Sequence, residues 1–550
     1  MSPTFRGVVR QGRGWVPLIG VAALLGSLAT LALPTVLGRA VDSIVAGGAS
    51  DHWFVAACVL IAVGVLSGLV DSYADAACAA GGTAWLRRRL VGQVLAAGPH
   101  GTRGLDTGDL VSRVSGSAVD AGQAAPVSVT AVATVLPPAG SLVLLAVIDP
   151  WLAAAFLVGV VGVLVVLAAF SRRTTEISQA YAVTQGRIAA LLTESLTGIR
   201  TIAAAGTVQR ERDRILQPLP ELHRQGVRTW QALARSGAQA AVIGPLVLVS
   251  VLAAGGLLLS EGRITAGELF AAGQYAILGA GLGSLTGVLG ELARARAGSR
   301  RADEIAGLEP LRYGALDPEP GPGRLDLVGV TVDGDDGPLL ADVNLSLPGG
   351  TTVAVVGSSG AGKSVLAALV ARLRDPDRGR VLLDGVPLPE LSHHALRTAV
   401  GVAFERPALF GTTVAAAIGA GTTDPDRVVE AARATHAHDF VSRLPAGYDT
   451  PLNEAPLSGG EAQRLGLARA WHADRLLLLD DATSSLDTAT EVQISSTLTA
   501  RGDRSRLIVT HRAGTADRAD LVVWLHSGRV RSVGMHRDLW LEEDYRRVFG

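Results

Sequence analysis

The chain has 550 residues, of which 48% are hydrophobic and only 18% are charged, against about 25% charged in typical soluble domains. This apolar content excludes a disordered chain, and two cysteines exclude a disulfide-stabilised scaffold. The formal net charge of −1 gives no basic footprint for nucleic acid, so no nucleic-acid partner is expected.

Apolar stretches crowd the first half of the chain. Each is long enough to cross a bilayer with a hydrocarbon core of about 30 Å. One such stretch alone is also typical of a buried core helix, but six of them, nearly free of charge, favour a membrane domain. The first is too long for a cleaved signal peptide and lacks a clear cleavage site. The predicted spans lie near residues 15–38, 53–77, 127–148, 151–170, 237–260 and 269–290.

Arginine placement indicates the orientation of these spans. If the N-terminus is cytoplasmic, the inner segments hold 22 arginines, whereas the outer loops hold only Arg39 and Arg263. The positive-inside rule predicts this asymmetry. We therefore expect a multi-pass protein of the bacterial cytoplasmic membrane, with its N-terminus and its C-terminal half in the cytoplasm.

A composition change separates the two halves. Proline and glycine crowd residues 306–323, which predicts a linker. Beyond it, short β-rich runs alternate with helical segments, the pattern of an α/β domain. We expect a polytopic α-helical membrane domain of six helices with long cytoplasmic loops over 1–305 and an α/β domain over 324–550.

The strongest motif follows a β-branched run and opens a helix. Its glycines allow backbone N–H groups to curl around phosphates, its lysine reaches the β- and γ-phosphates, and its last serine binds Mg²⁺. The lysine is the only one in the chain, against 48 arginines. The predicted phosphate-binding loop consists of Gly357, Ser358, Ser359, Gly360, Ala361, Gly362, Lys363 and Ser364.

Three further signals follow in order. The run RLLLLDD predicts a buried strand that delivers Asp480 and Asp481 beside the phosphate loop, which is the Walker B arrangement. The sequence LSGGE at 457–461 precedes that strand; a lone SGG is a common turn, but this spacing favours a functional role. His511 ends another β-rich run, and alone it would be read as structural.

In this order the motifs resemble one half of an ABC exporter, and the resemblance extends over nearly the whole chain. In the membrane half it includes PTVLGRAVD (34–42), LDTGDLVSRV (105–114), LLTESLTGIRTIAAAG (191–206) and EGRITAGELFA (261–271). It implies an α/β P-loop nucleotide-binding domain with a helical subdomain over 324–550. It also implies coupling helices near 98–113 and 200–213, and a dimer of two halves in the bilayer.

The resemblance also implies roles for single residues. ATP with Mg²⁺ would be held between the phosphate loop of one half and the signature motif of the other. Mg²⁺ would be bound by Ser364, Glu405 and Asp480. The residues implied in catalysis are Asp481, His511 and Glu405. The further residues implied in nucleotide binding are Asp480, Ser458, Gly459, Gly460, Glu461 and Asp487.

Several positions depart from the pattern of the family. Glu405 stands where a glutamine is usual, Asp481 where the catalytic glutamate is usual, and Glu461 where the signature usually has glutamine. No aromatic residue stands near Gly334 to stack on adenine. Because Asp481 is one methylene shorter than glutamate, these departures favour a degenerate site that binds ATP and hydrolyses it slowly. The alternative is neutral drift within a working site.

The resulting hypothesis is an ATP-driven exporter half that pairs with a different half-transporter carrying the catalytic glutamate. Three alternatives remain: an active homodimer, an importer built on the exporter fold, and a membrane regulator that uses ATP only as a ligand. The transported substrate is not readable from the sequence.

Overall fold

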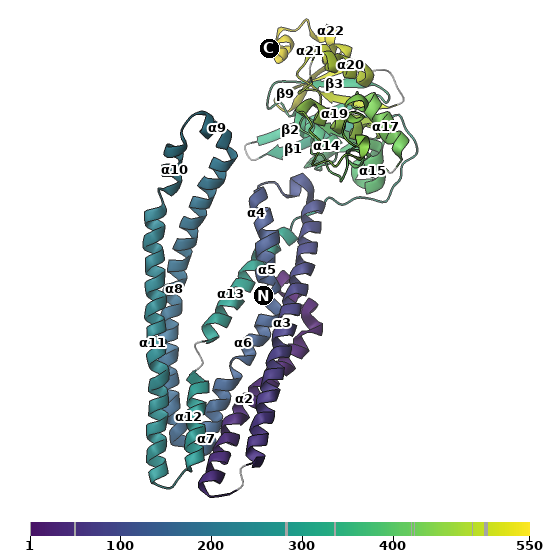
Figure 1. The fold of residues 1–550 in the computed structure, drawn as a ribbon. Coiled ribbons are helices and arrows are strands. Elements are labelled where there is room, and N and C mark those ends of the chain that lie inside the picture. Colours follow the sequence, from purple (N-terminus) through teal and green to yellow (C-terminus); the bar gives the residue numbers. More distant parts are fainter. Residues whose placement is uncertain are drawn as a thin grey trace. The chain divides into compact units, whose positions relative to one another are not determined.

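The computed structural model describes residues 2–48, 51–280, 284–334, 337–419, 421–422, 424–486, 488–499 and 504–550 (Figure 1). The chain forms two compact units. Unit 1 comprises residues 1–94 and 104–308, and unit 2 comprises residues 95–103 and 309–550. Each unit has apolar cores of its own.

The described part of unit 1 is made of helices, several of them long. The turn at Asp149-Pro150 is tight: Asp149 Oδ1 accepts a hydrogen bond from Trp151 N at 2.9 Å, which caps the next helix. The helices are α1 (Pro3–Gln11), α2 (Val16–Val45), α3 (Asp51–Gly101), α4 (Thr107–Ser112), α5 (Ala118–Gly122), α6 (Ala124–Ala133), α7 (Leu136–Ile148), α8 (Pro150–Thr197), α9 (Ile199–Ala204), α10 (Val208–Leu216), α11 (Leu219–Ser260), α12 (Ala266–Ala280) and α13 (Ser284–Ala306).

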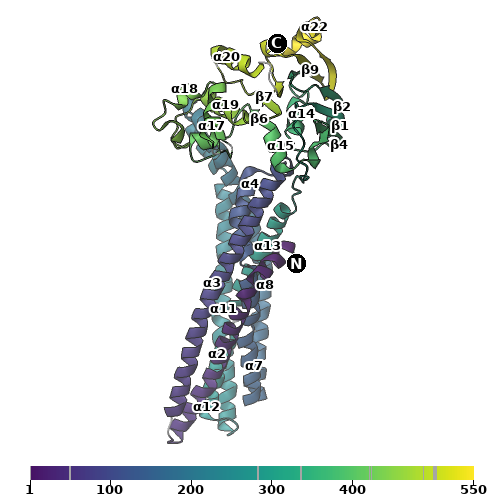
Figure 2. The same cartoon turned by 90° about the vertical axis from the view of Figure 1, so that its right-hand side faces the viewer.

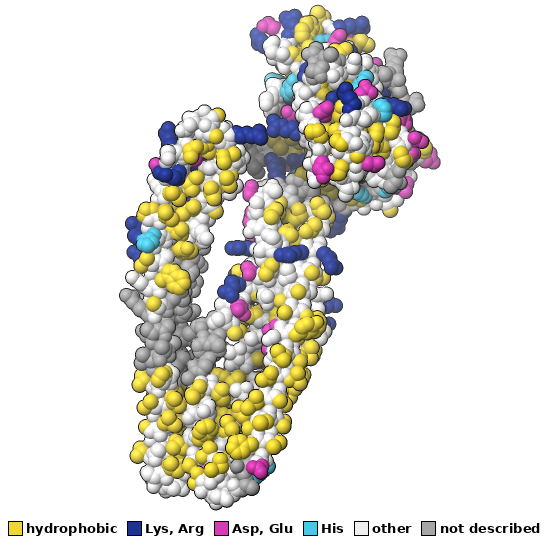
Figure 3. Space-filling model, in the orientation of Figure 1, with side chains coloured by type: hydrophobic (Ala, Val, Ile, Leu, Met, Phe, Trp, Pro, Cys, Tyr) yellow, Lys and Arg dark blue, Asp and Glu magenta, His cyan; other side chains and the backbone are white. Residues whose placement is uncertain are grey.

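Apolar helices of unit 1 meet the length requirement of a membrane. Figure 3 shows hydrophobic side chains, with few charged ones among them, over the end of unit 1 that holds α7 and α12. The count of six spans is not confirmed, because the last three predicted spans include residues whose side chains are not described. By length and composition, the described helices able to cross a membrane are Val16–Val45, Asp51–Gly101 and Thr107–Ile148, with shorter apolar segments at Pro150–Val161 and Gly244–Ser260.

Helices α2 and α12 approach each other closely. A Cβ on Gly38 would lie 2.5 Å from the carbonyl oxygen of Gly267, and a Cβ on Gly267 would lie 2.6 Å from Asp42 Cγ. Asp42 also holds the start of α12, because it accepts hydrogen bonds from Gly267 N and Thr265 Oγ1, both at 2.7 Å. Glycine is therefore required at both contact positions, and this helix pair is specified by individual contacts.

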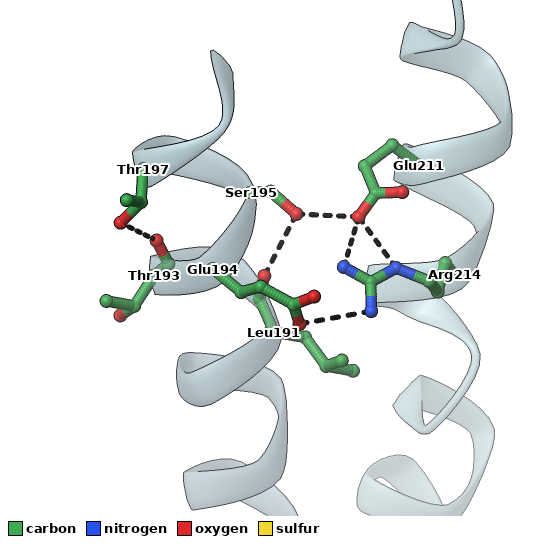
Figure 4. A network of polar contacts seen from close by, with 7 residues as sticks. All are labelled: Leu191, Thr193, Glu194, Ser195, Thr197, Glu211 and Arg214. Atoms are coloured by element: carbon green, nitrogen blue, oxygen red, sulfur yellow. Dashed lines mark hydrogen bonds and ion pairs between the residues drawn. The ribbon is translucent and has the colours of Figure 1, made fainter. Parts of the chain in front are cut away.

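A polar network joins the end of α8 to α10 (Figure 4). Glu211 Oε1 accepts hydrogen bonds from Ser195 Oγ at 2.8 Å and from Arg214 Nε at 2.6 Å. Arg214 also donates to Glu194 Oε2 at 3.1 Å. The guanidinium of Arg214, helped by the Ser195 hydroxyl, holds the pKa of the Glu211 carboxyl below its usual value. These bonds close the connection that contains α9, where the second coupling helix is expected.

Unit 2 is an α/β fold with two sheets. The four-stranded sheet has the order β2-β1-β4-β5, and the six-stranded sheet has the order β10-β9-β3-β8-β7-β6. Its elements are β1 (Leu325–Gly334), β2 (Gly337–Leu347), β3 (Thr352–Val356), α14 (Lys363–Val370), β4 (Arg378–Leu383), β5 (Val386–Pro387), α15 (His393–Ala399), β6 (Val400–Phe404), α16 (Val414–Gly419), α17 (Pro425–Ala434), α18 (His438–Val441), α19 (Gly459–Ala470), β7 (Leu476–Asp480), α20 (Thr488–Thr499), β8 (Ser505–Val509), α21 (Ala513–Arg518), β9 (Leu521–His526), β10 (Arg529–Gly534), α22 (His536–Leu539) and α23 (Glu543–Arg546).

The topology of the larger sheet positions the predicted site. Strands β9, β3, β8, β7 and β6 are parallel, and only β10 is antiparallel to its neighbour. The carboxyl ends of parallel strands lie at one edge of a sheet, which is where α/β proteins bind ligands. The segments that follow β3, β6, β7 and β8 therefore meet at this edge.

A helical part of unit 2 has a separate apolar core. Buried residues of α16, α17, α18 and α19, among them Val414, Val428, Phe440 and Leu465, form this core. Figure 2 shows α17, α18 and α19 on one side of β6 and β7, and β1, β2 and β4 on the other. The prediction of an α/β domain with a helical subdomain is thus confirmed.

The short segment 95–103 also belongs to unit 2. Gly98, with φ of +64°, interrupts the regular helix there. A Cβ on Gly101 would lie 3.3 Å from the carbonyl oxygen of Glu309. Burial lowers the pKa of His100, and the nearby charge of Arg374 lowers it further. This segment overlaps the start of the first expected coupling helix.

Candidate nucleotide site

The predicted phosphate loop lies between β3 and α14, in the strand–loop–helix setting that its function requires. All five residues of β3 are buried. Gly360 and Gly362 have φ of +78° and +98°, a backbone region in which glycine is strongly favoured. A Cβ on Gly362 would also lie 2.7 Å from Leu340 Cδ2, so this position has no room for a side chain. The glycines therefore shape the loop as the sequence predicted.

Lys363 stands at the first position of α14 and is only 7% exposed. Its ammonium group donates hydrogen bonds to the carbonyl oxygens of Gly357 at 2.8 Å and Ser358 at 3.0 Å. Burial lowers the pKa of Lys363, while the charges of Asp481 and Asp480 act in the opposite direction. A cation held across the mouth of a glycine-rich loop fits a phosphate group, so the loop residues suit ATP.

Asp480 ends β7 and Asp481 follows it, and the charges of both act on this lysine. Burial raises the pKa of Asp480, and the charges of Asp481 and Glu405 raise it further. Asp481 has φ of +46°, and its N–H donates to the carbonyl oxygen of Val509 at 3.2 Å. The structure thus gathers Lys363, Asp480, Asp481 and Glu405 at one edge of the sheet.

His511 also reaches this edge from the end of β8. Its Nε2 lies 3.5 Å from Asp481 Oδ2, and half of its side chain is exposed. Burial raises the pKa of Asp481, whereas the adjacent His511 and Lys363 lower it. The histidine that would be structural in isolation therefore contacts the proposed catalytic carboxylate.

The donor set at this edge fits Mg²⁺. Asp480 and Glu405 offer carboxylate oxygens and Ser364 a hydroxyl, the hard oxygen ligands that this ion prefers. Among the described residues, no three histidine, cysteine or acidic side chains are grouped closely enough to hold a metal by themselves. Phosphate oxygens would therefore complete the coordination, which is the usual way that nucleotide-binding proteins hold Mg²⁺.

The signature residues begin helix α19. Ser458 is its N-cap, and its hydroxyl accepts a hydrogen bond from Glu461 N at 3.3 Å. The Glu461 carboxylate accepts in return from Ser458 N at 2.8 Å and Ser458 Oγ at 2.7 Å, which completes a capping box. The Ser458 N–H keeps the pKa of Glu461 below its usual value. Glutamate at this position therefore suits the helix start.

The sequence analysis missed Gln463, one turn into α19. This side chain is 1% exposed. Its Nε2 donates to the carbonyl oxygen of Glu405 at 2.8 Å and to Ser484 Oγ at 3.1 Å, and its Oε1 accepts from Ser485 N at 3.0 Å. Gln463 thereby joins three segments around the site. Its only sequence signal is a polar residue on an otherwise apolar helix face.

Two further predictions concern Asp487 and the missing aromatic residue near Gly334. Asp487 lies outside the described residues. On the adenine side, Gly334 ends β1 and pairs with Gly337 of β2. Neither strand contains an aromatic residue, so β1 and β2 supply no ring to stack on a base.

Comparisons with known proteins agree with this geometry. The family profile of the ABC transporter transmembrane region matches residues 16–279, and that of the ABC transporter matches residues 340–484. The ABC transporter ATP-binding protein RamA of Streptomyces coelicolor is 46% identical over 545 residues, which is 98% of this chain and 86% of that protein. An ATP-dependent lipid A-core flippase of Chromobacterium violaceum is 35% identical over 64% of this chain and 62% of its own length.

A solved structure extends the likeness to the whole fold. The structure of a bacterial Atm1-family ABC exporter with ATP bound matches with a TM-score of 0.79 and 26% identity, covering 98% of each chain. This match includes the helical membrane region and the α/β nucleotide-binding region together. The chain therefore belongs to the ABC transporter family, as an exporter half-transporter that fuses a membrane domain to an ATP-hydrolysing domain.

Proposed function

We propose that this chain is the degenerate-site half of a heterodimeric ABC exporter in a bacterial cytoplasmic membrane, with its N-terminus and unit 2 in the cytoplasm. The observation that carries this proposal is Asp481. An aspartate stands where the resemblance expects a glutamate, and its carboxylate lies 3.5 Å from His511 Nε2. The missing methylene shortens its reach by about 1.5 Å. A well-placed general base contributes about 10²- to 10⁴-fold to a rate, so hydrolysis at this site should be slow.

Nucleotide binding at the same site is supported by the intact phosphate loop. Lys363 and the loop N–H groups would hold the phosphates, and Ser364, Asp480 and Glu405 would hold Mg²⁺. Bound ATP with Mg²⁺ supplies the phosphoanhydride bond whose cleavage drives transport. The absence of an aromatic residue in β1 and β2 removes base stacking worth about 1–3 kcal/mol on comparable surfaces. Binding without fast turnover is the expected result.

The signature motif supports the pairing with a different half. Ser458 is well ordered by the capping box, and a Cβ on Gly459 would have no neighbour within 4 Å, so the start of α19 is open. An open helix start suits a phosphate held by a second chain. In this proposal the competent site forms from this signature motif and the partner's phosphate loop and glutamate.

ATPase assays on the purified chain in nanodiscs, alone and with a second half-transporter that carries the usual catalytic glutamate, test the proposal. The chain alone should hydrolyse ATP feebly, and the partner should accelerate turnover. In the pair, Asp481→Asn should change the total rate by less than about twofold, whereas replacing the partner's glutamate should remove most activity, since a general base is worth about 10²-fold or more. Fast hydrolysis by the isolated chain would favour the active homodimer.

A further inference from the structure

Unit 2 has a polar pocket at the opposite edge of the sheet from the phosphate loop. Its volume is about 400 Å³. It lies where β7 and β8 begin, between the end of α19 and helix α17. The residues that line it are Arg427, Glu430, Trp471, His472, Ala473, Asp474, Arg504 and Arg506.

Two buried nitrogen atoms on the pocket lining have no hydrogen-bond partner among the residues that the structure describes, which leave out 500–503. Arg506 is 5% exposed, and its Nε is one of them. Its Nη1 makes only a long bond of 3.4 Å to the carbonyl oxygen of Arg504. The second atom is His472 Nε2. Buried polar groups without partners are costly, so a ligand with acceptor atoms would find an unpaired donor on this pocket wall.

Arg504, unlike Arg506, has close hydrogen-bond partners within the protein. Its Nη1 donates to the carbonyl oxygens of Trp471 at 2.5 Å and Ala473 at 2.8 Å, and its guanidinium carbon lies 4.1 Å from the centre of the Trp471 ring. It therefore closes the end of α19 and forms a fixed wall. Arg506 and the exposed Arg427 remain available to a ligand.

The charge of the pocket favours an anion. The lining holds three arginines and two carboxylates, Glu430 and Asp474, and the charge of Asp520, which is outside the lining, also acts on Arg506 and raises its pKa. Burial lowers the pKa of Arg506, and burial together with the charge of Arg506 lowers that of Arg504. Burial likewise lowers the pKa of His472. A bound anion would compensate the buried positive charges.

We propose that this pocket binds a phosphate-bearing small molecule at a site separate from the ATP site. A phosphate group offers acceptor oxygens in several directions, which matches donors that come from β8, α17 and the turn after α19. A volume of this size lies in the range of small-molecule sites. The inference does not depend on the heterodimer proposal.

Two strands connect the pocket to the nucleotide site. β7 leads from the pocket to Asp480, and β8 leads from it to His511. Five residues of extended strand span about 13 Å. A ligand in the pocket would therefore contact the starts of two strands whose far ends carry residues of the nucleotide site.

Equilibrium dialysis of radiolabelled inorganic phosphate against the full chain in nanodiscs tests the proposal. Mg²⁺ and a saturating non-hydrolysable ATP analogue fill the phosphate loop. The chain should bind one further phosphate. Arg427→Gln should weaken that binding about tenfold, because one charge-assisted hydrogen bond is lost. Arg433→Gln, on the same helix but outside the pocket, should leave it within about twofold.

A second variant and a competition arm complete the test. Arg506→Leu should abolish binding of the additional phosphate while the ATP analogue still binds. If this variant does not fold, the comparison of Arg427→Gln with Arg433→Gln, both at exposed positions of α17, still tests the proposal. Displacement of the label by AMP more strongly than by unlabelled phosphate would identify an organic phosphate as the ligand. Absence of the additional phosphate, or equal losses in Arg427→Gln and Arg433→Gln, would overturn the proposal.

Discussion

Replacing Gln463 by leucine should destabilise unit 2 and disturb the nucleotide site together. The side chain is 1% exposed and makes three hydrogen bonds to other segments. Leucine is of similar size but offers no donor or acceptor. The carbonyl oxygen of Glu405 would lose its donor, and the N–H of Ser485 would lose its acceptor.

The magnitude follows from these two backbone groups. A buried group left without its partner costs about 1–3 kcal/mol. The Ser484 hydroxyl can rotate to another partner, so it adds little. Glu405 and Ser485 are exposed residues and both bonds are only partly buried, so each group costs about 1 kcal/mol, and we expect a loss of about 2 kcal/mol in the free energy of unfolding of unit 2. For a unit of this size, this corresponds to a decrease of about 4–8 °C in Tm.

The assay is thermal unfolding of the full chain in detergent, followed by intrinsic fluorescence, with Gln493→Leu as the matched control. Gln493 is exposed on α20, so its replacement should change stability by no more than about 0.5 kcal/mol. The ATPase rate of the assembled pair should also fall in Gln463→Leu, because the segments at 405 and 484–485 lose their common anchor. Equal melting temperatures in the two variants would refute the role assigned to Gln463.

Three further predictions concern the site and the helix junctions. In the assembled pair at saturating ATP, Ser458→Arg should reduce ATPase activity more than Lys363→Ala, because a bulky cation at the start of α19 blocks the competent site; a more severe lysine variant would assign the degenerate site to the other half. Gly267→Val should abolish the yield of monodisperse protein in size-exclusion chromatography, because its side chain would enter the space of Asp42; a normal yield would show that α2 and α12 can separate. Asp149→Ala should lower stability by about 1 kcal/mol more than Asp149→Asn, which keeps the cap of α8; equal melting temperatures would show that the cap contributes nothing.

The sequence by itself determined the features that depend on short segments. The spacing of glycines around Lys363 identifies the phosphate loop, because the loop must curl around one phosphate group and begin a helix within eight residues. The length of the apolar stretches indicated a membrane domain, because bilayer thickness sets that length. The run before Asp480 predicted a buried strand, and β7 is buried as expected.

Only the tertiary structure decided the roles of residues whose partners are distant in the chain. Gln463 bonds to Glu405 and Ser485, which are 58 and 22 residues away, so no local pattern marks it. Glu461 differs from the residue that is usual in the family, yet in the folded helix its carboxylate accepts a hydrogen bond from the N–H of Ser458, the N-cap of α19. Arg506 sits in a strand like any other basic residue until folding buries it beside Trp471 and His472. Burial and hydrogen bonding depend on which segments the fold brings together, and one-dimensional spacing does not contain that information.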